Sequence, residues 1–430
     1  MVQKRHFFHV SGFDPYDITA LHRRFVREAA VFAATWNVTI AVSPLHQRGA
    51  ASPGATTQAE TTKAETTQSP APDNGDGHWT VTASAPGWQV RASYEQLDWS
   101  DIVRAELARP VLRRLWDGAT TFVDIIATGT AWRYFAANWR YGAFFLVPFL
   151  DVLLFAAIAV AAGWVAVSAT RPALGGLAGG LAGVLVAGVA FALLLRWPGE
   201  RWRVHQGLAD WIFARDYMLG RRPDMTARIE AFAARLIACA RRGDADEIVL
   251  AGHSLGATIA IDALACALMR DPDFSRHGPR ICVLTIGATI PKLALHPKGE
   301  RLRAQVNRVA AEQSLTWAEY QARDDIISFH KFDPVRLRRF KDVNEPDGPT
   351  IRRVQIHEMV KPETLARIRF NFMRLHYQFV MANERRTAYD YFMLMCGPAP
   401  FRQTVESPNG PADLYAADGA LRVAEGGPRR

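Results

Sequence analysis

Apolar positions along the first hundred residues alternate between strand-like and helix-like patterns. Residues 6–10 form a short apolar run, and residues 16–34 place apolar side chains at helical spacing. Residues 36–44 also read as a strand, and HWTVTASAP (78–86) and WQVRASYEQL (88–97) read as two strands joined by a Pro-Gly turn. Strands and a helix that follow one another in this way predict an α/β fold.

The second half of the chain continues this alternation. Residues 224–243 form a strongly amphipathic helical pattern, and the apolar strand DEIVLAG (246–252) follows directly. Further strands are predicted within RICVLTIGATIPKL (280–293), SLTWAEYQARDDIISF (314–329) and RRVQIHEMV (352–360). Between the two halves, the segment WSDIVRAELARPVLRRLWDG is predicted as one helix.

Two long apolar runs interrupt the alternation. Residues 152–170 and 172–195 contain no charged side chain, and each run has about the 20 residues that a helix needs to cross a bilayer. Their short connection predicts a tight antiparallel hairpin, in which LGGLAGGLAG supplies small residues for close helix contact. The alternative is a helical hairpin buried in a soluble protein.

Positive charge lies outside both ends of this hairpin. Arg133 and Arg140 precede the first run, and Arg196, Arg201 and Arg203 follow the second, whereas the turn carries a single arginine. Cytoplasmic flanks of membrane helices are enriched in Arg and Lys, so both flanks are expected on the cytoplasmic side. Together with Ala- and Arg-rich usage and no recognisable targeting segment, this predicts a bacterial inner-membrane protein.

Composition divides the chain into six segments with different expected roles. They are the first part of the α/β domain (1–46), a low-complexity loop (47–77), a continuation with an interfacial segment (78–140), the transmembrane hairpin (141–197), the main part of the domain (198–398) and a flexible tail (399–430). The loop is rich in Thr, Ala, Gln and Pro and cannot build a core. The tail is Pro- and Gly-rich and weakly patterned.

Composition also limits the classes of function. The 430 residues carry a formal net charge of +9 but no aromatic-interleaved basic stripe, so nucleic-acid binding is not expected. Cys239, Cys266, Cys282 and Cys396 are scattered without CxxC spacing, so neither a disulfide framework nor a zinc site is predicted. We expect buried thiols in a reducing compartment.

The strongest local motif stands between a predicted strand and a predicted apolar helix. Residues 252–256 read Gly-His-Ser-Leu-Gly and fit the pattern G-x-S-x-G. Gly252 and Gly256 would keep side chains away from neighbouring backbone, and the helix would direct its N-terminal N–H groups toward developing negative charge. This context predicts Ser254 as a nucleophile, with a structural turn as the alternative. His253 is expected to pack inside the motif and not to act as the base.

Through this motif the chain resembles the α/β-hydrolase superfamily, and GHSLGA is similar to the GHSLGG of lipases and esterases. The resemblance covers residues 247–398 most clearly and 6–15 more weakly, and Ala257 stands where many such lipases have a third glycine. It implies a mostly parallel sheet flanked by helices, with the transmembrane hairpin as an insertion. It also implies a triad in the chain order Ser, acid, His.

The resemblance implies an acid at the end of the strand in residues 314–329. Asp324 and Asp325 both lie there, and we favour Asp325 because it directly precedes an apolar pair. A carboxylate at this point would fix the tautomer of the imidazole and stabilise the imidazolium. At least one of the two aspartates must be a solvated turn residue.

Three histidines follow these acids. His376, in FNFMRLHYQFVM, comes after the last predicted strand, where the superfamily has its base, and we favour it. His357 lies inside that predicted strand and remains an alternative, while His330 is close to the acids and reads as a loop residue. The other interpretation of His376 is a core histidine on a helix.

The resemblance further implies two backbone donors for an oxyanion hole. One is the N–H of Leu255, directly after the serine. The other comes from the loop after an early strand, for which HVSGFDP is the best match, with Gly12 allowing close approach and Phe13 as the donor.

The resulting hypothesis is a membrane-anchored serine hydrolase that cleaves an acyl ester and needs neither a metal nor an organic cofactor. The lipid bilayer is its expected partner, and hydrophobic acyl esters or lipids are its expected substrates. The alternatives are a thioesterase or amidase with the same triad, and a non-catalytic membrane scaffold that keeps the fold.

Overall fold

The computed structural model describes residues 1–47, 77–340 and 348–422. The predicted low-complexity loop, residues 47–77, therefore lies outside the described residues except for its two ends. The chain forms two compact units. The sheet unit comprises Met1–Val103, Pro223–Ala294 and Glu300–Arg430, and the helical unit comprises Arg104–Arg222 and Leu295–Gly299.

A nine-stranded sheet forms the centre of the described part of the sheet unit. Its order is β11-β8-β7-β6-β1-β5-β4-β2, with β3 also pairing with β4. The strands are β1 (Lys4–Val10), β2 (Thr39–Val42), β3 (His46–Gln47), β4 (Gly77–Ala85), β5 (Trp88–Gln96), β6 (Glu247–His253), β7 (Arg280–Ile286), β8 (Thr316–Ala322) and β11 (Thr350–Val354). The six strands from β11 to β5 pair in parallel, and β4, β2 and β3 add antiparallel pairs. The predicted mostly parallel sheet is thus present.

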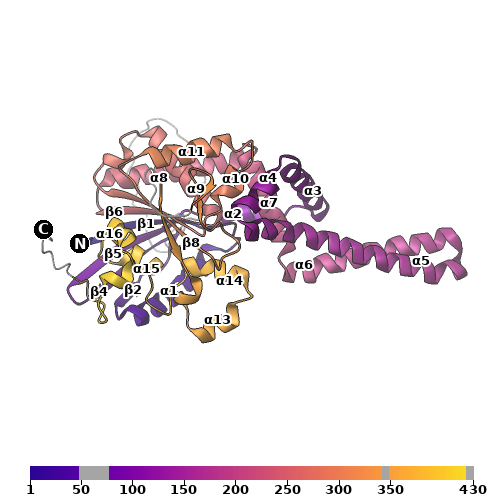
Figure 1. Ribbon diagram of the computed structural model, residues 1–430, viewed down its shortest axis with the longest axis horizontal. Coiled ribbons are helices and arrows are strands. Elements are labelled where there is room, and N and C mark those ends of the chain that lie inside the picture. The colour runs from indigo at the N-terminus through magenta and orange to yellow at the C-terminus, as the bar shows by residue number, and fades with distance from the viewer. Residues whose placement is uncertain (48–76, 341–347, 423–430) are drawn as a thin grey trace, which may run out of the picture. The chain divides into compact units, whose positions relative to one another are not determined.

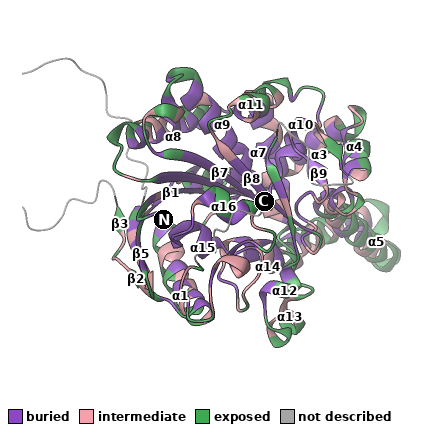
Figure 2. Ribbon diagram, turned by 60° about the vertical axis from the view of Figure 1, so that its left-hand side comes forward, coloured by how far each residue is buried: buried purple, intermediate pink, exposed green. Residues whose placement is uncertain are grey.

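Burial along the strands explains their sequence patterns. Every residue of β6 is buried, as expected for a parallel strand covered on both faces, and it reads as one apolar run. In β4 and β5 burial alternates, with Trp79, Val81, Trp88 and Val90 facing inward. Those strands accordingly carry alternating polar residues. Figure 2 shows the central strands as buried.

Helices cover both faces of the sheet (Figure 1). On one face lie α8 (Pro223–Arg242), α9 (Leu255–Arg270) and α11 (Glu300–Ala311). On the other lie α1 (Ile18–Trp36), α14 (Phe372–Tyr377), α15 (Tyr391–Cys396) and α16 (Phe401–Glu406). The sheet unit also contains α10 (Ile290–Ala294), α12 (Ile356–Met359), α13 (Pro362–Ile368), α17 (Pro411–Leu414), the 3-10 turns η1 (Phe274–Arg276) and η2 (Gln378–Val380), and the small ribbon β9 (Phe332–Asp333) and β10 (Arg338–Arg339).

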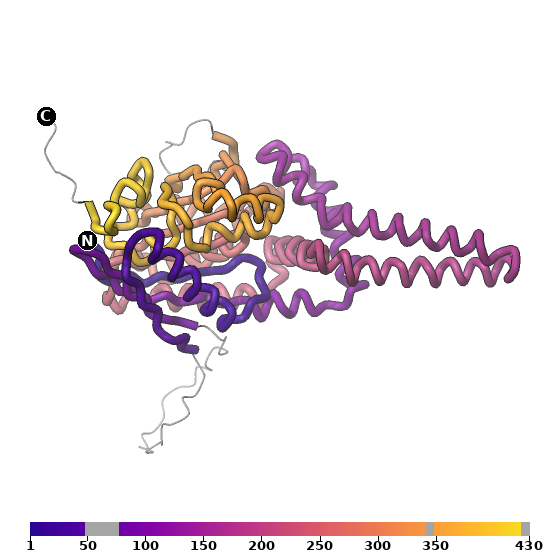
Figure 3. The backbone as a smooth tube through the Cα atoms, turned by 90° about the horizontal axis from the view of Figure 1, so that it is seen from below, coloured from indigo at the N-terminus to yellow at the C-terminus, as the bar shows by residue number. Residues whose placement is uncertain are grey.

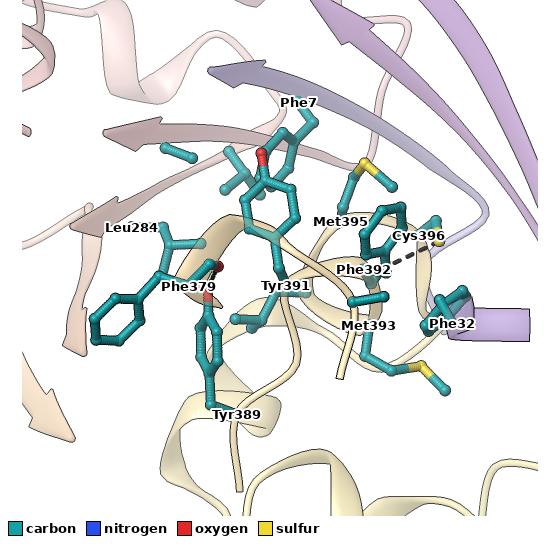
Figure 4. Packing of buried hydrophobic residues seen from close by; sticks show 14 of the residues in the cluster. Phe7, Phe32, Leu284, Phe379, Tyr389, Tyr391, Phe392, Met393, Met395 and Cys396 are labelled. Atoms are coloured by element: carbon teal, nitrogen blue, oxygen red, sulfur yellow. Dashed lines mark hydrogen bonds between the residues drawn. The ribbon is translucent and has the colours of Figure 1, made fainter. Parts of the chain in front are cut away.

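A large core cluster lies on the α1 and α15 face. Phe7 of β1 packs edge-on against Tyr391, and Phe32 of α1 stacks on Phe392, with ring centroids 5.4 Å apart in each pair. Figure 4 shows these side chains converging around α15. Segments from both ends of the chain, β1 and α1 at one end and α15 at the other, therefore build one core. Strand β1 lies in the middle of the sheet, where it pairs with both β5 and β6.

The helical unit packs around aromatic side chains. Its helices are α3 (Val111–Ala127), α4 (Thr130–Ala137), α5 (Trp139–Arg196), α6 (Pro198–Arg201) and α7 (Val204–Met218), and α2 (Ser100–Leu107) precedes them. Tyr134 of α4, Tyr141 and Phe145 of α5 and Trp211 of α7 are buried and in mutual ring contact. This core surrounds the first turns of α5 and leaves the rest of that helix outside it.

Helix α5 turns back on itself at Gly175, whose φ of 80° and ψ of 175° are not helical (Figures 1 and 3). The two arms then lie against each other, since a Cβ added at Gly163 would fall 2.7 Å from the carbonyl oxygen of Gly183. On the outer surface of the arms, Leu177, Val184 and Trp164 are 83%, 73% and 71% exposed. Among the described residues, one stretch, Trp139–Arg201, is long and apolar enough to cross a membrane.

The structure differs from the sequence-based expectations at three places. The helix predicted over WSDIVRAELARPVLRRLWDG is two helices, α2 and α3, because Pro110 lacks a backbone N–H donor and restricts the residue before it. His357 is not in the last strand, which ends at Val354, but in α12. Within residues 399–422, the expected tail contains α16 and α17, and Phe401 and Tyr415 are buried in the core.

Candidate active site

Ser254 stands alone between the end of β6 and the start of α9, in a strained conformation. Its φ is 58° and its ψ is −125°, a region that a residue with a side chain rarely adopts and that costs about 1–3 kcal/mol. The surrounding hydrogen bonds hold it there. Its N–H donates to the carbonyl of Ile286 at 3.1 Å, and its own carbonyl accepts from Ala257 and Thr289.

The two glycines of the motif are required by close backbone contacts. A Cβ at Gly252 would fall 2.5 Å from the Cα of Ala257, and one at Gly256 would fall 2.3 Å from the carbonyl oxygens of Val10 and Ser11. No side chain fits at either distance. The sequence G-x-S-x-G therefore reflects the tight passage from β6 into α9 beside the end of β1.

The loop after β1 lies directly against Ser254. A Cβ at Gly12 would be 3.0 Å from the Cβ of Ser254 and 3.5 Å from its Oγ. Phe13 follows, is buried and packs edge-on against Trp99. Leu255 is the first residue of α9 and is also buried. Gly12, Phe13 and Leu255, the residues predicted for an oxyanion hole, are thus brought to the serine from two separate segments.

A buried imidazole–carboxylate pair lies nearby. Nδ1 of His376, on α14, is 2.7 Å from Oδ2 of Asp325, and both side chains are almost completely buried. The carboxylate also accepts from the hydroxyl of Ser328 at 2.6 Å and from the N–H of Ile327 at 3.0 Å. These donors fix the carboxylate, and a neutral imidazole that donates from Nδ1 presents an unprotonated Nε2.

That Nε2 is buried and makes no hydrogen bond within the part of the chain that the structure describes. Leaving a buried polar atom unpaired costs about 1–3 kcal/mol, so such an atom needs an explanation. The imidazole is next to the serine loop, since a Cβ at Gly287 would be 3.1 Å from its Cε1 and Ile286 accepts from the N–H of Ser254. A bond from the Ser254 hydroxyl to Nε2 is not formed here, and catalytic hydrogen bonds of this kind often tighten only when substrate binds.

The ring of His253 packs against the imidazole of His376. The two rings are 4.5 Å apart, and Nε2 of His253 lies 3.1 Å from the carbonyl oxygen of His376. Burial lowers the pKa of His253 well below its usual value, so this ring stays neutral. It packs against the backbone of His376.

The alternative acid and base pair with each other away from this cluster. Nδ1 of His357 lies 2.9 Å from Oδ2 of Asp324, and the two side chains are 47% and 30% exposed. His330 is half-buried in the loop between β8 and β9. The candidate residues therefore separate into one buried pair beside Ser254 and one exposed pair.

Two residues that the sequence did not indicate connect these elements. The hydroxyl of Tyr377, next to His376, donates to Oδ2 of Asp14 at 2.5 Å, and Asp14 belongs to the loop after β1. This contact ties the histidine-bearing helix to the loop that touches Ser254. Asp14 lies within the HVSGFDP segment and Tyr377 directly follows His376, but no local signal indicated that the two side chains pair.

Among the described residues, no group of three or more His, Cys, Asp or Glu side chains could hold a metal ion. All four cysteines are unpaired, and Cys239, Cys282 and Cys396 are buried. Burial raises the pKa of Cys239 to about 12, so that thiol is unreactive at neutral pH.

Comparisons of the chain with protein-family models, with curated proteins and with solved structures gave no match.

Proposed function

We propose that this protein is a membrane-anchored serine hydrolase that cleaves an acyl ester. The observation that carries the proposal is the strained backbone of Ser254 at the passage from β6 to α9, beside a buried His376–Asp325 pair with an unpaired Nε2. A protein keeps such strain and an unsatisfied buried nitrogen together most readily at a reactive site. The mostly parallel sheet flanked by helices is compatible with the α/β-hydrolase fold.

In the proposed reaction, Oγ of Ser254 attacks the ester carbonyl while Nε2 of His376 takes its proton. Asp325 stabilises the imidazolium, and the N–H groups of Leu255 and Phe13 bind the negatively charged oxygen. The imidazolium then gives its proton to the departing alcohol, and an acyl-enzyme remains. Water, deprotonated by His376, releases the acid and restores the serine.

The same residues would support a thioester or an amide as substrate, because these leaving groups follow the same steps. We favour an ester of a hydrophobic acid or a lipid, because the chain also carries an apolar hairpin. Membrane attachment does not by itself dictate the substrate.

We propose that the two arms of α5 span a membrane. A surface of exposed Leu, Val, Ile and Trp side chains of this extent is unfavourable in water, and only 28% of the most apolar window is buried. The arms meet at Gly163 and Gly183, as is typical of membrane helices that pack through small residues. Arginines outside both ends of the hairpin favour a cytoplasmic sheet unit in a bacterial inner membrane.

A fluorophosphonate probe tests the proposed nucleophile. Full-length protein would be purified in detergent and treated with the probe as wild type, as Ser254→Ala and as Ser314→Ala, in which an exposed serine is changed. We expect labelling of the wild type and of Ser314→Ala, and none of Ser254→Ala. Mass spectrometry of the labelled peptide would identify the residue.

Absence of labelling in a well-folded wild type, repeated in lipid nanodiscs, would contradict the proposal and favour a non-catalytic scaffold. Labelling that persists in Ser254→Ala would contradict the assignment of this serine. If labelling is as expected, turnover of matched oxygen esters, thioesters and amides would identify the leaving group.

A further inference from the structure

A small pocket lies beside the segment that touches Ser254. It has a volume of about 20 Å³, which is room for about one water molecule. Ser11, Asp14, Tyr16, Arg24 and Asp98 contribute to its wall. Since Ser11 directly precedes Gly12, which contacts Ser254, the pocket is adjacent to the proposed nucleophile.

Arg24 is the cationic side chain in this wall. Its guanidinium lies over the rings of Tyr16 and Tyr377, 5.9 Å and 5.5 Å from their centroids. It is half-buried, and it makes no hydrogen bond or ion pair with any residue that the structure describes. Two aromatic rings thus hold a planar, partly desolvated group whose N–H donors are unused.

The two carboxylates of the pocket are engaged differently. Asp14 accepts from the N–H of Tyr16 at 3.1 Å and from the hydroxyl of Tyr377 at 2.5 Å. Asp98 accepts from the N–H and the hydroxyl of Ser100, each at 3.0 Å. These contacts hold both carboxylates in the wall, so their oxygens already have donors whereas the donors of Arg24 lack acceptors.

Tyr377 connects this arginine to the proposed catalytic base. It follows His376 on α14, and burial raises the pKa of its hydroxyl well above the usual value, so it remains a donor to Asp14. The face of its ring carries Arg24. The guanidinium is therefore fixed relative to the helix that presents the imidazole.

We propose that Arg24, held between Tyr16 and Tyr377, binds an anionic group of the substrate, either a carboxylate or a phosphate. This inference rests on the proposed function, since it gives the substrate class of the same site. A guanidinium fork matches both groups with two parallel hydrogen bonds, and the aromatic contacts orient it before the ligand arrives. The substrate is accordingly an acyl ester that also carries a negative charge.

Binding of small anions tests the subsite independently of catalysis. Full-length Ser254→Ala protein in phosphatidylcholine nanodiscs would be titrated by ligand-observed NMR with monobutyl phosphate, butyrate, butanol and butylamine. We expect saturable binding of at least one anion and none of butanol. Adding Arg24→Gln should weaken anion binding by about tenfold or more, because charge-assisted hydrogen bonds are lost.

Matched variants separate the role of Arg24 from an effect of net charge. Arg23→Gln removes an exposed neighbouring charge on α1 and should leave binding unchanged. Arg24→Lys keeps the charge without the planar fork and should keep part of the affinity. Comparison of monobutyl phosphate with butyrate distinguishes a phosphate from a carboxylate as the preferred group.

Ester hydrolysis by proteins that keep Ser254 provides the second test. The ratio of kcat/KM for mono(4-nitrophenyl) succinate to that for 4-nitrophenyl butyrate should fall about tenfold in Arg24→Gln and stay constant in Arg23→Gln. Anion binding that depends on Arg24 without any ester turnover would retain the subsite and contradict the hydrolase proposal. Anion binding equal in Arg24→Gln, or tighter binding of butylamine, would overturn the subsite even if both esters are hydrolysed.

Discussion

At the scale of single residues, two similar acid–histidine pairs have different surroundings. Asp325 and His376 are buried against each other and next to the Ser254 loop. Asp324 and His357 form a similar contact, at 2.9 Å compared with 2.7 Å for the buried pair, but at the surface. Water and salt screen the exposed pair, whereas a buried carboxylate can orient an imidazole and stabilise its charged form.

This difference gives the first prediction. Asp325→Asn keeps the size of the side chain but replaces an accepting carboxylate oxygen with a donating NH2 group. The imidazole of His376 would then lose its proton at Nδ1 and carry it on Nε2, which is the wrong tautomer for a base. We expect kcat/KM for an ester substrate to fall by about 10⁴. Asp324→Asn is the matched control and should change it less than about threefold. Equal losses in both variants would contradict the assignment of the acid.

Glu319 is a second buried acid, and it has no assigned role in the reaction. It lies on β8 and accepts from Thr285 at 3.0 Å and from Gln321 at 2.5 Å. Burial raises its pKa from 4.5 to about 7, with Asp333 nearby adding to the effect. The folded protein therefore holds this proton more tightly than the unfolded chain does.

The second prediction follows from the sign of this shift. Because the folded pKa is the higher one, the contribution of Glu319 to stability decreases as pH rises from about 4.5 to about 7 and is constant above that. Stability of Glu319→Gln relative to wild type should therefore increase by up to roughly 3 kcal/mol between pH 4.5 and pH 7.5. Denaturant unfolding at several pH values measures it, with exposed Glu230→Gln as the control. A constant difference would contradict the buried, protonated state.

At the scale of elements, helix α5 depends on small residues where its arms meet. A side chain at Gly183 would fall 2.3 Å from a methyl group of Val167 and 2.8 Å from the carbonyl oxygen of Gly163. Gly188 lies on the same arm with no atom within 4 Å of an added Cβ. The two glycines therefore have similar sequence surroundings but different packing.

The third prediction uses this contrast. Gly183→Ile should force the arms apart and destabilise the hairpin by about 1–3 kcal/mol, as overpacking does in other well-packed interfaces. Gly188→Ile should have little effect. Thermal unfolding of both variants in the same detergent measures the difference. Equal melting temperatures would show that the arms do not pack through Gly183.

At the scale of the whole molecule, one sheet unit is assembled from chain segments on both sides of the helical unit. The central strand β1 pairs with β5, which precedes α5, and with β6, which follows it. Both flanks of the apolar hairpin must therefore lie in one compartment. An even number of membrane crossings satisfies this requirement, and two crossings by α5 agree with it.

The fourth prediction concerns membrane topology. The reversal of α5 lies at Gly175, four residues after the predicted connection, and Arg171 is the single arginine near it. With arginines at both flanks, this turn is expected outside the cytoplasmic membrane. A cysteine at Gly176, exposed directly after the turn, should react with a membrane-impermeant maleimide in intact cells, and one at Arg242, exposed on the sheet unit, only after lysis. The unsubstituted protein controls for the native cysteines, of which three are buried. Labelling of both positions only after lysis would contradict the topology.

Sequence alone determined the features that depend on local pattern. Alternating apolar positions gave the strands β4 and β5, the apolar run before GHSLG gave β6, and helical spacing gave α1 and α8. The motif also located the strained serine, since its glycines are needed wherever backbone passes so closely. The helix end before Pro110 was missed, because the apolar spacing continues across the proline and predicted one helix.

Only the tertiary structure decided which distant residues lie together. Asp324 and Asp325 are neighbours in sequence, and the sequence favoured Asp325 only through the apolar pair that follows it. The structure gives the two side chains different burial and different histidine partners. Arg24, Tyr377 and Asp14 lie far apart in sequence and meet because α1, α14 and the loop after β1 converge. The physical reason is range: periodicity and turn chemistry act over a few residues, whereas burial and side-chain pairing depend on packing between segments hundreds of residues apart.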